Sequence, residues 1–159
     1  MREQVEIRLE PLKATAMESI CTLLHISCSS IRRKHGDSHY FLMGNYRNWL
    51  AASSQCRAFG MTLAAAKDVT DVRVFHDMLT GFSSSTTVAA WLDGTKMMTI
   101  DNWYCTSYGY ACPRIPWASG EPSNSASESC VCLWPGQTDG VNDCACSDLL
   151  PFICEFNPH

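Results

Sequence analysis

Cysteine is the feature that most constrains how this chain can fold, with ten in 159 residues. This density is typical of domains held together by disulfides in an oxidising compartment, so we expect a secreted, extracellular protein. Four of the ten form two Cys-x-Cys pairs, Cys130 with Cys132 and Cys144 with Cys146. Such pairs and the five histidines could instead bind zinc, but zinc sites more often use two-residue gaps. The pattern therefore favours disulfides.

Length and charge limit the domain count and the partners. The chain is long enough for one domain with its own core and short for two. Its formal net charge is −4, and residues 1–36 hold six of the twelve basic and four of the sixteen acidic side chains, which leaves the remainder at −6. Nucleic acid is excluded as a partner, because its binding depends on Lys and Arg neutralising phosphates. No apolar run has the length of a membrane span.

The spacing of apolar residues predicts two helices, one over Tyr46–Phe59 and one from Val69 to Leu79, stopped by Gly60 and Gly81. A long irregular stretch from Asp93 to Cys130 follows a predicted strand, and such a loop in a small domain is normally functional. Strands are predicted over His39–Met43, Val88–Leu92, Cys130–Trp134 and Val141–Cys146. These elements predict an α+β domain of two helices packed on small antiparallel sheets, with one long loop that carries the site.

The first 37 residues are predicted to be an N-terminal extension, and residues 38–159 to be the domain. The extension contains a short apolar run, Ile20–Ile26, that resembles a degenerate signal segment, and Met17 is an alternative start. A polar stretch around Ser27–Lys34 is predicted to be a linker. Cys21 and Cys28 could bridge to each other locally or to another chain.

Oxygen-bearing side chains interleave with the cysteines near the C-terminus. The chain places Glu121-Pro122-Ser123 and Glu128-Ser129-Cys130 before Asn142-Asp143-Cys144, and ends with Cys154-Glu155. Calcium takes six to eight oxygen ligands from carboxylates, amides and carbonyls. The pattern therefore predicts a binding site for Ca2+ rather than a catalytic site.

The order and spacing of these motifs resemble the C-type lectin-like domain over about residues 38–157. The resemblance includes Tyr40-Phe41 as an opening strand, Cys56 in the first helix, and Trp91-Leu92-Asp93-Gly94 as a variant of the family's central Trp-Ile-Gly-Leu strand. It implies the C-type lectin-like fold and calcium-dependent carbohydrate binding, with glycan recognition in innate defence as a possible role.

The resemblance also implies disulfides. The family's bridges correspond to Cys56–Cys154 and Cys130–Cys146. If Cys130 faces Cys146 in an antiparallel ladder, Cys132 should face Cys144, which gives a third bridge by register. Cys105 and Cys112 are close enough in sequence to close the short loop between them.

Five residues are implied both as metal ligands and as sugar contacts: Glu121, Ser123, Glu128, Asn142 and Asp143. Calcium can hold two neighbouring sugar hydroxyls while the same carboxylates and amides hydrogen-bond to them. Glu121 favours a mannose-type sugar, and Ser123, where mannose-type members carry Asn, leaves galactose open. Pro122 matches a position where the family has a cis peptide bond. Sugar binding should fail in mildly acidic buffer, because protonated carboxylates no longer bind calcium.

Further residues bear on an accessory calcium site and on which aromatic side chains are exposed. Lys96-Met97-Met98 occupies the region of the family's accessory calcium site, so that site should be absent. Trp91 and Trp117 are expected in the core and Trp134 at the surface.

The chain is expected not to be an enzyme, since no catalytic motif is present, although Glu121 and Glu128 could in principle act as a glycosidase pair. The main alternative to sugar recognition is a calcium-independent lectin-like module that binds proteins or surfaces. A homo-oligomer is possible, because multivalency strengthens weak sugar binding.

Overall fold

The computed structural model describes residues 32–83, 88–99 and 102–157. Cys21, Cys28, Met17 and the apolar run Ile20–Ile26 lie outside the described residues. Among the helices that are described, none is both long enough and apolar enough to cross a membrane.

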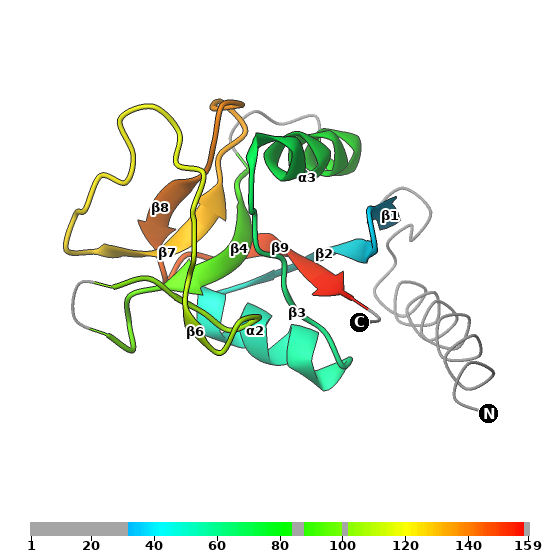
Figure 1. Cartoon of the computed structure of the whole chain (residues 1–159), viewed down its shortest axis with the longest axis horizontal. Coiled ribbons are helices and arrows are strands. Elements are labelled where there is room, and N and C mark those ends of the chain that lie inside the picture. The colour runs from blue at the N-terminus through cyan, green and yellow to red at the C-terminus, as the bar shows by residue number, and fades with distance from the viewer. Residues whose placement is uncertain (1–31, 84–87, 100–101, 158–159) are drawn as a thin grey trace.

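The described residues form an α+β domain, as predicted, but their strands join in one mixed sheet and not in small antiparallel sheets (Figure 1). Strand β2 (Ser38–Arg47) pairs antiparallel with β9 (Leu150–Phe156), so the beginning and end of the domain lie side by side. The main path through the sheet is β1-β2-β9-β4-β5-β6. Strand β3 (Thr62–Leu63) also pairs with β9, and β7 pairs with both β4 and β8.

The N-terminal edge differs from the prediction. Strand β1 (Arg32–His35) forms an antiparallel hairpin with β2. The described part of the expected linker Ser27–Lys34 is therefore strand. The side chains of Arg32, Arg33 and Lys34 remain exposed, which is typical of an edge strand protected by charge and explains why a polar, basic segment could be mistaken for a linker.

Helix α2 (Trp49–Ala58) begins at Asn48, whose side chain accepts a hydrogen bond from the Ala51 amide at 2.9 Å. It starts three residues later than predicted, because Tyr46 and Arg47 complete strand β2. Its buried face includes Trp49 and Cys56, and the Trp49 indole donates to the Leu92 carbonyl on the central strand at 2.9 Å.

Helix α3 (Val69–Phe82) lies on the opposite side of the sheet from α2 (Figure 1). Asp68 caps its N-terminus by accepting from the Asp71 amide at 2.9 Å. Phe75 on its buried face meets Tyr40 of β2 edge-to-face, with ring centroids 4.9 Å apart. The two helices thus cover two separate apolar clusters, one on each face of the sheet.

The central strand β4 (Ala90–Thr95) is buried along its whole length. It continues past the predicted end at Leu92, even though Asp93 is charged. The expected irregular stretch after it contains a small hairpin of β5 (Tyr104–Cys105) and β6 (Tyr110–Ala111), and the disulfide Cys105–Cys112 closes this hairpin.

Strands β7 (Glu128–Leu133) and β8 (Asn142–Ala145) pair antiparallel and overlap the strands predicted over Cys130–Trp134 and Val141–Cys146. The structure contains the bridges Cys56–Cys154, Cys130–Cys146 and Cys132–Cys144. The register argument behind the third was wrong, however, because the ladder sets Cys130 opposite Cys144 and Cys132 opposite Asn142. Each of these two bridges therefore joins a diagonal neighbour, two residues along the partner strand.

Candidate binding site

One cavity of about 430 Å³ gathers all five residues predicted as ligands. The long loop contributes Glu121 and Ser123, strand β7 contributes Glu128, and strand β8 contributes Asn142 and Asp143. Its wall also includes Trp134 and Asp148. The peptide bond between Glu121 and Pro122 is cis, as the resemblance implied.

Backbone contacts explain why the long loop reaches β8. The Ala118 amide donates to the Val141 carbonyl, and the Val141 amide donates to the Pro116 carbonyl, both at 2.9 Å. Gly140 makes this approach possible, because a Cβ there would lie 2.3 Å from the Ala118 nitrogen. The loop is therefore clamped three residues before Glu121, directly beside the Asn142-Asp143 pair.

Asp143 is the most buried member, with 3% of its surface exposed. Its two carboxylate oxygens accept hydrogen bonds from the backbone amides of Ser123 and Asn124, each at 2.9 Å. Burial acts to raise the pKa of Asp143, but these two amides, together with the contact to Glu121 and the backbone amide of Asp143 itself, outweigh it, so the pKa lies below its usual value. Asp143 therefore remains ionised and fixes the conformation of the loop.

The Ser123 hydroxyl lies between two carboxylates. Its oxygen is 2.5 Å from Glu128 Oε1 and 3.2 Å from Asp143 Oδ2. A hydroxyl has a single hydrogen to donate, so it serves one carboxylate at a time. Ser123 thus links the Glu128 and Asp143 side chains where the family resemblance expects a metal ligand.

Glu121 lies beside Asp143 at the edge of the cavity. Partial burial, together with the contact and the charge of Asp143, raises the pKa of Glu121. The two carboxyl groups thus have pKa values shifted in opposite directions. A positive charge bound between them would favour ionisation of both.

Asn142 is held by a residue in the turn of the hairpin. Its side-chain amide nitrogen donates to the side-chain oxygen of Gln137. The Gln137 backbone carbonyl in turn lies 2.7 Å from His76 Nε2 on helix α3. The Asn142 Oδ1 atom is buried and has no hydrogen-bond partner. Gln137 therefore orients the Asn142 amide and leaves its oxygen available.

The chemistry of this donor set suits calcium, since it offers three carboxylates and one unpartnered amide oxygen. The arrangement is nevertheless not that of a closed metal cage. Within residues 32–83, 88–99 and 102–157, no three His, Cys, Asp or Glu side chains are gathered closely enough to hold a metal ion. Glu128 and Asp143 are instead bridged by the Ser123 hydroxyl.

The three tryptophans for which a position was predicted lie where they were expected. Trp91 is fully buried, and Trp117 packs against the core. Trp134 has 41% of its surface exposed and lines the cavity. In the expected accessory region, the Lys96 ammonium is 5.1 Å from the centroid of the Trp103 ring, so this segment presents a cation and not carboxylate ligands.

No role was predicted from the sequence for Gln137 or Asp93, two residues that help to shape the surface of the domain. No pattern marks Gln137, because its role depends on the fold of the turn. Asp93 did have a signal, since a carboxylate within the apolar run Trp91-Leu92-Asp93-Gly94 must find donors when it is buried.

Comparison with known proteins decides the family. The family model "Lectin C-type domain" matches residues 45–156. The chain belongs to the C-type lectin domain family. Proteins of this family are binding proteins without enzymatic activity, so this lectin-type domain is not an enzyme and the glycosidase alternative is set aside.

Individual relatives are distant. C-type mannose receptor 2 of Homo sapiens is 23% identical over 112 residues, which cover 70% of this chain and 7% of the receptor. The chain therefore corresponds to a small part of that protein.

Solved structures show the same fold. The mouse scavenger receptor C-type lectin carbohydrate-recognition domain superposes with a TM-score of 0.65 and 19% identity, over 82% of this chain and 96% of that one. A calcium-independent type II antifreeze protein superposes with a TM-score of 0.66 and 18% identity, over 82% of this chain and 95% of that one. The fold alone therefore does not decide between sugar binding and other binding.

Proposed function

We propose that the domain is an extracellular, calcium-dependent lectin whose cavity around Asp143 binds a sugar. The observation that carries this proposal is the convergence in one cavity of Glu121, Glu128, Asn142 and Asp143, with Asn142 Oδ1 left unpartnered. Buried polar atoms normally have a partner, so an unpartnered amide oxygen beside three carboxylates favours a missing cation.

Calcium would be held by the carboxylates of Glu121, Glu128 and Asp143 and by Asn142 Oδ1, and when bound it supplies open coordination positions for two sugar hydroxyls. The protein's own groups then provide selectivity. Glu121 would accept a hydrogen bond from a sugar hydroxyl, and the resemblance of Glu121-Pro122-Ser123 to the family motif favours a mannose-type sugar. Trp134 offers an exposed aromatic face at the same cavity.

Ser123 is the element that must rearrange. Its hydroxyl now donates its one hydrogen to either Glu128 or Asp143, the carboxylates that would bind the cation. A rotation of this small side chain turns its hydrogen away and presents its oxygen as a further ligand, directly or through water. Such a change needs no movement of the backbone that Asp143 holds.

The test is retention of the oxidised protein on mannose- and galactose-coated resins in calcium, followed by elution with a chelator. We expect retention on mannose and release by the chelator. Glu128→Gln should abolish retention, because it removes a charge from the cation site while keeping the size of the side chain. Asp77→Asn, an exposed change on α3, is the matched control and should be retained like the unchanged protein.

A second candidate function is calcium-independent binding of a protein or another surface. It is favoured by the Ser123 bridge, in which the hydroxyl lies within hydrogen-bond reach of two of the three carboxylates and donates to one of them at a time without a cation. A folded protein that stays off both resins, and whose melting temperature does not change with calcium, would support this alternative.

A further inference from the structure

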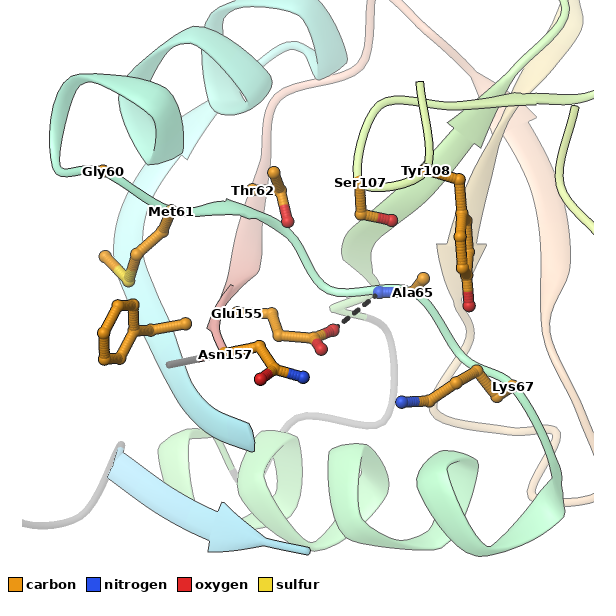
Figure 2. Close-up of a pocket in the computed structure, with 10 residues that line it drawn as sticks. Gly60, Met61, Thr62, Ala65, Lys67, Ser107, Tyr108, Glu155 and Asn157 are labelled. Carbon is orange, nitrogen blue, oxygen red and sulfur yellow. Dashed lines mark hydrogen bonds between the residues drawn. The ribbon is translucent and has the colours of Figure 1, made fainter. Parts of the chain in front are cut away.

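A second cavity, of about 440 Å³, lies away from the predicted ligands, between the segment that follows helix α2, the tip of the β5–β6 hairpin and the end of β9 (Figure 2). None of the five ligand residues lines it. Its lining is mostly polar at the centre, with Met61 at one end (Figure 2), and Phe156 also lines it. The residues that the argument uses are Thr62, Lys67, Ser107, Tyr108 and Glu155.

Glu155 is the fixed acceptor of this cavity. Its carboxylate accepts from the Ser38 hydroxyl at 2.9 Å and from the Ala65 amide at 3.3 Å, the latter drawn as a dashed line in Figure 2. Each carboxylate oxygen can accept two hydrogen bonds, so one acceptor position on each remains. Glu155 is therefore held in place and can still accept from a ligand.

Lys67 supplies the opposite charge. Its side chain is exposed, and Figure 2 shows its ammonium group pointing into the same space as the Glu155 carboxylate and the Asn157 amide. The hydroxyls of Thr62 and Ser107 face this space as well. Donors and acceptors thus surround a volume large enough for a small polar molecule.

Tyr108 forms an aromatic wall that the fold holds rigidly. The turn just before it is fixed by the buried carboxylate of Asp93, which accepts from the Thr106 amide and hydroxyl, both at 2.9 Å, and from the Ser107 amide at 2.8 Å. The disulfide Cys105–Cys112 closes the same hairpin. The Tyr108 ring therefore stands at one side of the cavity, in the position shown in Figure 2.

We propose that this second cavity binds a neutral saccharide ring without calcium, as a site separate from the one around Asp143. A hydroxyl both donates and accepts, so a single sugar hydroxyl can donate to Glu155 and accept from Lys67. Neighbouring hydroxyls reach Thr62 and Ser107, and the C–H face of the ring packs on Tyr108. An anionic ligand is disfavoured by Glu155, and a purely apolar one would leave both charges without partners.

The test follows the backbone amide signals of the 15N-labelled full chain in EDTA during titration with methyl α-mannopyranoside and, separately, methyl β-galactopyranoside. We expect saturable shifts at Ala65, Lys67, Ser107 and Tyr108 with a dissociation constant on the order of 1–10 mM, as for other ligands of this size. Two variants remove groups from the cavity, Lys67→Met and Tyr108→Ala. Lys34→Met and Tyr46→Ala change the same residue types on β1 and β2 and serve as controls.

Each outcome decides the proposal. Affinity weakened about tenfold or more by both cavity variants, and kept in both controls, supports it. Absence of saturable shifts in these amides at about 100 mM of either sugar, ten times the weakest expected constant, overturns it. Shifts that survive Lys67→Met also overturn it, and because Lys67 is exposed this variant decides the matter even if Tyr108→Ala does not fold. EDTA keeps the result independent of the calcium site, so either site can fail alone.

Discussion

Asp93 and Thr106 are joined by two hydrogen bonds to one oxygen atom, since the Thr106 amide and its hydroxyl both donate to Asp93 Oδ1 at 2.9 Å. The second carboxylate oxygen accepts from the Ser107 amide at 2.8 Å. Asp93 has 3% of its surface exposed, so these donors replace the water that a carboxylate would otherwise bind. A charge in the central strand thereby anchors a turn that lies 13 residues further along the chain.

Asp93→Asn should lower the free energy of unfolding by about 2 kcal/mol, the order of effect of losing charge-assisted hydrogen bonds in a buried site. An asparagine can still accept from Thr106 through its oxygen, but its NH2 group then faces the Ser107 amide, which is also a donor. Urea unfolding followed by fluorescence measures the change. Asp77→Asn, on the exposed face of α3, should change the free energy of unfolding by less than about 0.5 kcal/mol. Equal stabilities for the two variants would contradict the anchoring role.

Much of this domain could be predicted from its sequence because local patterns coincide with the fold. The helical spacing of Trp49, Ala52 and Cys56 marks the face of α2 that is buried. The Glu-Pro-Ser, Glu-x-Cys and Asn-Asp motifs mark residues that do meet in one cavity. In both cases, residues that act together lie in short segments with fixed spacing.

Other structural relationships depend on contacts between segments that are distant in the chain, and such contacts leave no pattern in the sequence. The register of β7 and β8 is set by a bulge between Glu128 and Cys130, so the diagonal geometry of the Cys132–Cys144 bridge could not be read from residue numbers. Strand β1 carries exposed charges and lacks alternation, and its pairing with β2 defines it. The second cavity combines Lys67, Tyr108 and Glu155 from three separate segments.

Ser123→Asn should strengthen calcium binding by about tenfold, an effect in the range seen when a metal site gains one supporting group. The substitution removes the hydroxyl that donates to either Glu128 or Asp143 and brings an amide oxygen, a ligand that calcium prefers. Calorimetric titration with calcium measures the affinity, and the chelator-treated protein gives the baseline.

The control for this change is Ser54→Asn, which makes the same substitution at an exposed position of α2. Its calcium affinity should equal that of the unchanged protein. A Ser123→Asn protein that is folded but binds calcium no better would show that the hydroxyl bridge does not limit the site.

Removal of the Cys56–Cys154 bridge, by Cys56→Ala with Cys154→Ala, should lower the free energy of unfolding by about 4 kcal/mol, since the bridge closes a long loop in the unfolded chain, with a sequence separation of 98. The Cys105–Cys112 bridge closes a shorter loop, with a sequence separation of 7. Its removal, by Cys105→Ala with Cys112→Ala, should therefore lower the free energy of unfolding by less. Guanidinium unfolding under oxidising conditions measures both. A larger loss from the β5–β6 bridge would mean that strain or packing outweighs loop closure.

His76 should make the domain less stable in mild acid. Burial of its ring lowers its pKa below the usual value of 6.5, outweighing the contact with the Gln137 carbonyl, which acts in the opposite direction. Since the unfolded chain then binds a proton more readily than the folded one, the contribution of His76 is complete above about pH 6.5 and is lost as the pH falls through its folded-state pKa.

The measurement is the free energy of unfolding between about pH 5 and pH 7.5, compared with that of His76→Gln. The glutamine amide can still donate to the Gln137 carbonyl but does not titrate, so the decline of stability toward acid should become shallower. His35→Gln alters a more exposed imidazole, which lies 3.7 Å from Asp71, and it should leave that decline in place. A decline of the same slope in His76→Gln would place the responsible group elsewhere in the domain.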